Sequence, residues 1–267
     1  MIDYKAIRRE LNEILQREMK KSFWNKNSSG KTAVEKEVHR KDGTTFMQTF
    51  YTKIKNIFSK PTSDKSAPLY PGSFATIEDA EAVLGKPYED GALEEWYDQI
   101  RPASKHAIKQ YSGVWYSDIN GVERGSILKS DLDSQTYSQV RQYSQLIEQA
   151  LNKYELKQDI VLHRQVGKQM LSVFQQAFKS SDKTFIDEGF FSTTAVKNSV
   201  QRHNSIDLVI KVPKGKGRGA YIKYLSDHPF ENEFLINNHS VFTVDNVSQV
   251  KGRWQVELSW KNRMDVV

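Results

Sequence analysis

The chain has 267 residues, of which 38% are hydrophobic, and it contains no cysteine, which excludes disulfides, thiolate metal sites and a cysteine nucleophile. Its apolar runs are only a few residues long, well short of the roughly 20 needed to cross a bilayer, so we expect no membrane span. The formal net charge is +6 at pH 7 and is unevenly distributed: residues 1–68 hold 15 Lys and Arg against 8 Asp and Glu, and residues 69–267 hold 24 against 25.

Residues 1–68 are predicted to form a basic arm ahead of the main domain. Apolar side chains at helical spacing predict an amphipathic helix over residues 3–24, with Lys and Arg on its opposite face. Two partly alternating runs joined by Asp42 and Gly43 then predict a β-hairpin. The Pro- and Ser-rich stretch over residues 59–71 predicts a linker, so we place the domain boundary near residue 68. Such an arm favours an acidic partner, whether nucleic acid, an acidic protein face or a membrane surface, although its charge could simply keep it soluble.

The rest of the chain changes from a helical to a strand-rich pattern. Apolar periodicity predicts helices over residues 76–84, 92–100, 104–111 and 137–154, and one more over residues 170–178. Strands are expected over residues 160–164, 190–194, 206–212, 220–222, 233–236, 241–244 and 254–258. A helical half followed by a strand-rich half predicts an α+β fold.

Three separated stretches of the strand-rich half carry side chains suited to catalysis. Arg164 ends a predicted strand, where a guanidinium can project into a cleft and bind a diphosphate bidentately. The hydroxyl run Ser192–Thr194 ends another strand. Glu231 and Glu233 lie one residue apart where a loop becomes a strand, and in an extended segment both point to the same face. Each stretch alone has an ordinary interpretation, as a surface ion pair, strand filler or a solvated edge; their combination in this order indicates an active site.

These motifs resemble those of the Arg-Ser-Glu class of mono-ADP-ribosyltransferases, which includes actin-modifying subunits of bacterial binary toxins, Rho-modifying exoenzymes and similar phage enzymes. The resemblance covers residues 74–260, and within it Tyr111–Gly125 is similar to the family's helical segment along the dinucleotide. It implies NAD as substrate and a core of two packed β-sheets flanked by helices in a catalytic domain of residues 69–267. The small basic helix-and-hairpin arm would precede that domain. The six histidines show no metal-ligand spacing and cysteine is absent, so we expect no metal site.

The resemblance implies a role for each motif residue. Arg164 would hold the NAD phosphates, and Ser192 would brace Glu233. Glu233 would steady the oxocarbenium-like ion, through the ribose 2′-hydroxyl, as nicotinamide leaves. Glu231 would hold or deprotonate the acceptor; because it is Glu rather than Gln, the family pattern implies an arginine acceptor. The other residues implied to bind NAD are Tyr111, Tyr116, Asn120, Arg124, Gln165, Gln169, Thr193 and Arg202.

Two departures from the family pattern concern cofactor binding. Binary-toxin relatives have a second arginine after the strand arginine, but this chain has Gln165, so we expect phosphate binding to be either weaker or shared with Gln169. The loop after the Ser-Thr-Thr strand contains Arg202, an expected phosphate ligand, but no Phe or Tyr to stack on nicotinamide. Phe191 or His203 would then supply the ring face.

We therefore predict an enzyme that cleaves NAD and transfers ADP-ribose to an arginine of a target protein, as a bacterial toxin or effector or as a phage enzyme that modifies its host. An NAD glycohydrolase and a structural binding protein with an inert transferase-like domain are the alternatives. The first residues lack the apolar core of a classical signal peptide, so we expect a bacterial or phage cytoplasmic protein or delivery to a host cell by a non-Sec route. We expect a monomer.

Overall fold

The computed structural model describes residues 70–85, 92–197 and 206–264. The predicted arm over residues 1–68 lies outside these ranges, so the arm and its boundary stay predictions. Within the described part of the chain, no helix is both long enough and apolar enough to cross a membrane.

The helices largely match those predicted, and side-chain caps explain where two of them begin. Thr76 and Asp79 form a reciprocal capping box at the start of α3. Asp133 accepts from the backbone N–H groups of Gln135 and Thr136, so α7 begins at Ser134, three residues before its predicted start. The helices are α3 (Ile77–Leu84), α4 (Ala92–Gln99), α5 (Pro102–Gln110), the π-helix η1 (Tyr111–Trp115), α6 (Tyr116–Glu123), the 3-10 turn η2 (Lys129–Asp131), α7 (Ser134–Leu151), the 3-10 turn η3 (Lys168–Met170) and α8 (Leu171–Lys179).

The strands form one large sheet and one small sheet, as the α+β prediction requires. The eight-stranded sheet has the order β3-β9-β10-β5-β2-β4-β8-β7, and β1 pairs with β6 in the second sheet. All seven predicted strands are present; the last two are longer than predicted, and β1, β3 and β6 were not predicted. The strands are β1 (Glu155–Leu156), β2 (Ile160–Val166), β3 (Thr184–Asp187), β4 (Phe191–Thr194), β5 (Ile206–Val212), β6 (Gly215–Lys216), β7 (Gly219–Tyr221), β8 (Glu233–Ile236), β9 (Ser240–Val250) and β10 (Arg253–Arg263).

The large sheet folds back on itself at the junction between β2 and β4. These strands share a single registered pair, His163 opposite Thr194, whereas β2 and β5 pair along seven residues. The ring centroids of Phe191 on β4 and Phe242 on β9 nevertheless lie 5.5 Å apart, although three strands, β10, β5 and β2, separate β9 from β4 in the sheet order. The predicted core of two packed sheets is therefore formed by the two halves of this one sheet, on either side of the β2–β4 junction.

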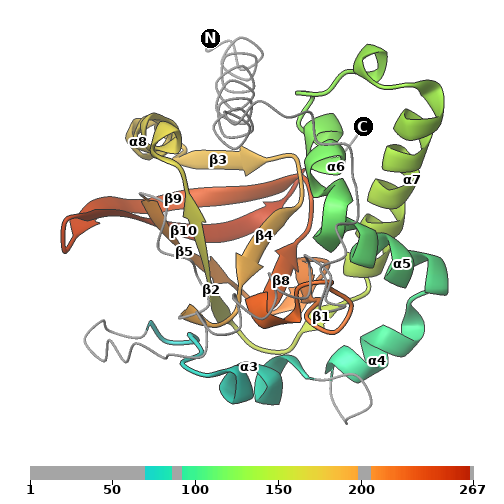
Figure 1. Cartoon of the computed structure of the whole chain (residues 1–267). Helices are drawn as coiled ribbons and strands as arrows, with labels where there is room; N and C mark the ends of the chain where they lie inside the picture. The colour runs from blue at the N-terminus through green and yellow to red at the C-terminus, as the bar shows by residue number, and fades with distance from the viewer. Residues whose placement is uncertain (1–69, 86–91, 198–205, 265–267) are drawn as a thin grey trace, which may run out of the picture. The chain divides into compact units, whose positions relative to one another are not determined.

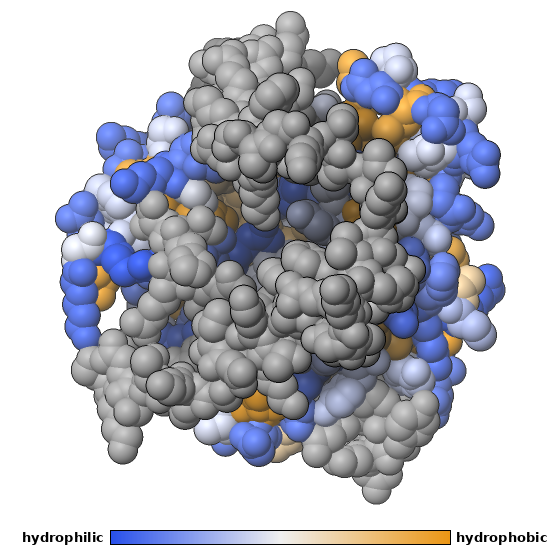
Figure 2. Space-filling model, in the orientation of Figure 1, coloured by the Kyte–Doolittle hydropathy of each residue, from blue (hydrophilic) through white to orange (hydrophobic). Residues whose placement is uncertain are grey.

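Helices cover both ends of this core (Figure 1). Helix α8 packs its Phe174 ring 5.0 Å from the Phe185 ring of β3. On the other side, Trp96 of α4 donates to the Ala150 carbonyl of α7 at 2.7 Å and packs edge-on against Tyr154. The outer face of α7 is mainly hydrophilic in the space-filling view (Figure 2), as expected for a helix with one buried side. This helical layer carries η1 and α6, which contact the strand ends described below.

Candidate active site

Three adjacent strands bring together residues that are far apart in the sequence. Arg164 lies on β2, Ser192 on β4 and Glu233 at the start of β8, and these strands are neighbours in the sheet. Arg164 Nη1 donates to the Ser192 carbonyl oxygen at 2.7 Å. In the pairing of β4 with β8, Ser192 lies opposite Leu235 and Thr194 lies opposite Glu233. The predicted Arg, Ser and Glu therefore form one cluster.

Arg164 is held by one aromatic ring and one backbone carbonyl. Its guanidinium lies 4.4 Å from the centroid of the Phe191 ring, a cation–π geometry. Burial lowers its pKa and nearby Arg124 lowers it further, but an arginine stays charged under any biological condition. Among the described residues, its hydrogen-bond acceptor is the Ser192 carbonyl alone. The remaining guanidinium donors suit an anion such as a diphosphate.

Glu233 is a buried carboxyl group with 6% of its surface exposed. Burial raises the pKa of Glu233 to about 7; a hydrogen bond from Ser192 opposes this rise, nearby Glu231 adds to it, and Arg164 opposes it. A carboxyl perturbed by burial together with specific charged neighbours is typical of a catalytic site.

Glu231 does not share a strand face with Glu233, contrary to prediction. It ends the 3-10 turn η5 (Pro229–Glu231) and is exposed, and strand β8 begins only at Glu233. Asn232 between them adopts a left-handed conformation with φ 49°, and its buried amide donates to the Phe230 carbonyl at 3.0 Å. An asparagine tolerates this conformation, which interrupts the extended segment on which the prediction depended. Glu231 is therefore exposed while Glu233 is buried, although partial burial of the Glu231 carboxyl still raises its pKa.

A second group of side chains lies directly behind Ser192. The Tyr111 hydroxyl is 3.2 Å from Ser192 Oγ, and Asn120 Nδ2 donates to the Tyr111 oxygen at 2.8 Å. The Phe190 N–H donates to Asn120 Oδ1, also at 2.8 Å. Burial raises the pKa of Tyr111 to about 12, and the charge of Glu233 contributes to the rise, so Tyr111 keeps its proton. Tyr111 and Asn120 are 1% and 7% exposed, so they stand behind the site and not on its surface.

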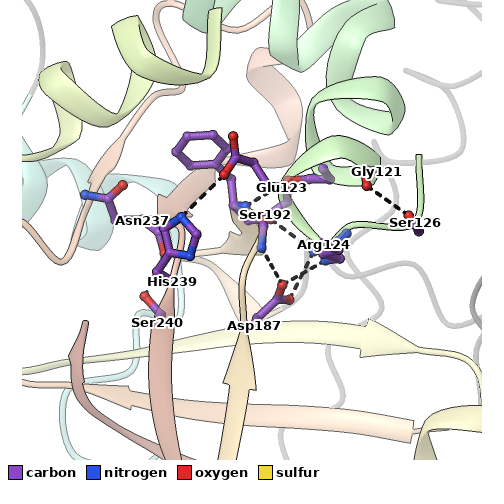
Figure 3. Close-up of polar contacts among 12 residues, drawn as sticks. Gly121, Glu123, Arg124, Ser126, Asp187, Ser192, Asn237, His239 and Ser240 are labelled. Atoms are coloured by element: carbon purple, nitrogen blue, oxygen red, sulfur yellow. Dashed lines mark hydrogen bonds and ion pairs between the residues drawn. The ribbon is translucent and has the colours of Figure 1, made fainter. Parts of the chain in front are cut away.

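Arg124 is bound by a carboxylate that the sequence analysis did not single out. Its Nε and Nη2 donate to the two oxygens of Asp187 at 2.8 and 3.0 Å, and Figure 3 shows the two side chains pointing toward one another. The Gly189 N–H donates to the same carboxylate at 2.9 Å. A Cβ on Gly189 would lie 2.7 Å from Asn120 Oδ1, so this close approach requires glycine. An Asp two residues before a glycine turn was the available sequence signal for Asp187.

Helix α6 has a further anchor at Glu123, next to Arg124. Glu123 Oε1 accepts from Arg141 and Ser144 of α7, each at 2.7 Å. His239 Nε2 lies 3.4 Å from Glu123 Oε2, as seen in Figure 3. Burial raises the pKa of Glu123, but the hydrogen bonds from His239 and Ser144 with the charge of Arg141 outweigh it and hold the pKa below its usual value. These contacts fix the helix that carries Asn120.

Several predicted NAD-binding residues are not brought to this cluster. Thr193 donates to the Phe234 carbonyl at 2.5 Å, on the strand face opposite to Ser192. Gln165 donates to Asp207 at 2.7 Å, likewise opposite to its neighbour Arg164. Gln169 lies in η3, and its amide packs over Gly167, while Tyr116 is 55% exposed at the start of α6. Arg202 lies outside the described residues.

The acidic and imidazole side chains of the described ranges form no group of three or more that could hold a metal ion.

The sequence model of a family described as ADP-ribosyltransferase exoenzyme matches residues 86–263, well over half of the chain. A curated relative, NAD(+)--arginine ADP-ribosyltransferase EFV of Enterococcus faecalis, is 26% identical over 165 residues. That match covers 59% of this chain but only 31% of the relative, so the chain spans less than a third of that protein.

Solved structures of similar fold include the Clostridium limosum C3 exoenzyme, with a TM-score of 0.59 and 19% identity over 71% of this chain and 97% of that one. The ADP-ribosylating toxin BECa of a binary enterotoxin of C. perfringens has a TM-score of 0.53 and 18% identity, covering 64% of this chain and 46% of that one. At such identities these two similarities concern the fold.

Proposed function

Because the chain belongs to the ADP-ribosyltransferase exoenzyme family, we propose that it cleaves the nicotinamide–ribose bond of NAD and transfers ADP-ribose to an arginine of a target protein. The observation that carries this proposal is the meeting of Arg164, Ser192 and Glu233 on three adjacent strands, with the Glu233 carboxyl buried beside the other two.

In the proposed reaction the arginine and the buried carboxyl act on different parts of NAD. The guanidinium of Arg164 binds the diphosphate, which is the group its planar fork matches. The ionised carboxylate of Glu233 accepts a hydrogen bond from the ribose 2′-hydroxyl. Its negative charge stabilises the positive charge that develops at C1′ as the bond to nicotinamide breaks. Nicotinamide leaves with the bonding electron pair. A fixed carboxylate at such a position contributes roughly 3–4 kcal/mol to catalysis.

Glu231 is the residue proposed to contact the target arginine that receives ADP-ribose. It is exposed at the end of η5, two residues from the buried Glu233. At this position it is accessible to a side chain of a target protein. There it would bind the acceptor guanidinium and take the proton released when the nitrogen attacks C1′. The name of the E. faecalis relative supports an arginine acceptor. Hydrolysis by water, as an NAD glycohydrolase, needs the same buried cluster but no role for Glu231.

The remaining predicted contacts and the biological setting stay part of the proposal. Tyr116, with its exposed ring, and Arg202 are proposed to contact NAD, and residues 1–68 are proposed as a basic arm that guides partner choice. Action as a toxin or effector on a host protein is proposed by analogy with the toxin relatives.

The test is incubation of the protein with labelled NAD and a cell lysate, followed by mass spectrometry of the labelled peptides. Label on arginine side chains, lost with Glu233→Gln, is the expected result. Release of nicotinamide without any labelled protein would favour the glycohydrolase, and no NAD cleavage by the folded wild type would refute the proposal.

A further inference from the structure

Ser192 ends a hydrogen-bond chain that starts at a backbone amide and runs through two buried side chains. The Phe190 N–H donates to Asn120, Asn120 donates to Tyr111, and the Tyr111 hydroxyl reaches Ser192 Oγ. Because Asn120 and Tyr111 are almost fully buried, neither NAD nor an acceptor protein has direct access to them. What they do for the site must therefore pass through Ser192.

The backbone amide sets the direction of the first two bonds in this chain. A backbone N–H can only donate, so Asn120 turns its carbonyl oxygen toward Phe190 and its NH₂ toward Tyr111. The Tyr111 oxygen thus already accepts one bond, and its single proton has two acceptors within reach. They are Ser192 Oγ at 3.2 Å and the Phe190 carbonyl at 3.4 Å.

The Ser192 oxygen is the better acceptor for that proton. The distance is shorter, and the Phe190 carbonyl already accepts from Arg124 Nη2 at 3.4 Å. A Ser192 hydroxyl that accepts from Tyr111 keeps its own proton for another partner. Glu233, on the neighbouring strand, is that partner, and its pKa is lowered by the hydrogen bond from Ser192 against the larger rise that burial causes.

We infer that Asn120 and Tyr111 are positioning residues, which turn the Ser192 hydroxyl toward Glu233 and favour the ionised carboxylate. This role differs from the direct NAD contact that the resemblance implied for both residues. The inference rests on the proposed function, in which ionised Glu233 stabilises the developing cation. Other groups that act on the same carboxyl are Arg164 of β2, Glu231 of η5 and Tyr111 of η1, with Arg124 and Asp187 close behind them.

The first test is a direct titration of Glu233, which needs no enzymatic activity. Full-length protein labelled with ¹³C in its glutamate carboxyl groups is titrated by NMR, and Glu233→Gln identifies the Glu233 signal. Tyr111→Phe removes the hydroxyl but keeps the ring that packs edge-on against Phe190 at 5.6 Å. Loss of one hydrogen bond should raise the midpoint of Glu233 by about 0.5–1 pH unit.

A matched control removes another buried tyrosine hydroxyl. Tyr154 is also 1% exposed, and its hydroxyl donates to the Leu84 carbonyl at 3.4 Å, outside the chain of bonds to Ser192. Tyr154→Phe should leave the Glu233 midpoint where it is. An equal shift in both variants would mean that general loosening of the core, and not the chain through Ser192, moves the carboxyl.

A second variant tests the direction of the bonds and serves if Tyr111→Phe fails to fold. Asn120→Asp keeps the side-chain size and still accepts from Phe190, but a carboxylate cannot donate to Tyr111, so the Tyr111 proton turns away from Ser192. Alone, it should raise the Glu233 midpoint through both this reversal and its added charge. In a Ser192→Ala background no hydroxyl can pass this reversal on to Glu233 and only the charge effect remains, so the added shift should be smaller.

Activity measurements then separate the positioning role of Tyr111 and Asn120 from the proposed NAD cleavage. In Tyr111→Phe the acidic limb of the NAD cleavage profile should move upward with the Glu233 midpoint, with little change in KM for NAD. An unchanged midpoint in folded Tyr111→Phe, or equal shifts from Asn120→Asp in both backgrounds, would overturn the inference. A wild type that shows the predicted midpoints but cleaves no NAD would refute the proposed function and leave the role of the hydrogen-bond chain intact.

Discussion

Asp187 holds Arg124 through two hydrogen bonds of 2.8 and 3.0 Å, which join the end of β3 to the end of helix α6. The same carboxylate accepts from the Gly189 N–H, so it also shapes the turn that leads into the strand of Ser192. Any phosphate that contacts Arg124 would share this arginine with Asp187. The pair therefore stabilises the frame of the site whether or not NAD is bound.

Replacing Asp187 by Asn should destabilise the protein, because it removes the negative charge that binds the partly buried Arg124 guanidinium. We expect a loss of about 1.5–3 kcal/mol in the free energy of unfolding, the value of a hydrogen bond to a charged group. Urea unfolding measures it. Asp98→Asn, at an exposed position on α4, is the control and should stay within about 0.5 kcal/mol of the wild type. Equal midpoints for the two variants would contradict a structural role for the pair.

Glu233→Gln should make the folded protein more stable above neutral pH while abolishing NAD cleavage. The folded-state pKa of Glu233 is raised by burial from 4.5 to about 7, so the folded state binds the proton more tightly than the unfolded state. The ionised carboxyl therefore destabilises the fold increasingly as pH rises from about 4.5 to 7, by on the order of 3 kcal/mol once both states are ionised. Below pH 4.5 this difference disappears.

Thermal unfolding at pH 5 and pH 8 checks the expectation for Glu233. The gain in Tm from Glu233→Gln should be larger at pH 8, and NAD cleavage at pH 8 should fall by about 10²-fold or more. A Tm difference that does not depend on pH would show that the Glu233 carboxyl has no raised pKa in the folded protein.

Glu231→Gln should separate the two halves of the proposed reaction. Because Glu231 is exposed at the end of η5 while Glu233 is buried, the change should remove arginine modification and leave most NAD hydrolysis intact. Nicotinamide release and transfer to a small guanidine compound can be followed in the same reaction. If both rates fall by the same factor, the division of labour between the two glutamates is incorrect.

Arg164→Lys should weaken NAD binding although it preserves the charge. A lysine lacks the planar fork that binds a diphosphate through two bonds, so the affinity should fall by about 1.5–3 kcal/mol for each hydrogen bond lost. Calorimetry with the Glu233→Gln background avoids turnover during the titration. Arg141→Lys, whose arginine binds Glu123 away from the cluster, is the control. An unchanged dissociation constant for Arg164→Lys would remove this residue from the NAD site.

Local patterns were sufficient to predict most elements of the described region. The strands over residues 206–212 and 233–236 have the predicted bounds, because their β-branched and aromatic runs are bounded by turn residues. The prediction was less accurate where one residue changes the local backbone. Asn232 in its left-handed conformation separated Glu231 from the strand, and the Asp133 cap moved the start of α7.

The sequence by itself determined the residue types of the site: an arginine, a serine strand and a final glutamate, in an order that resembles one enzyme family. Only the tertiary structure decided which side chains meet. The pairing of β2, β4 and β8 joins segments up to about 70 residues apart. In the buried region behind these strands, Tyr111 and Asn120 support Ser192, and Arg124 pairs with Asp187. Local residue preferences act over a few neighbours, whereas these contacts depend on how the whole sheet folds back and on which polar groups burial forces to pair.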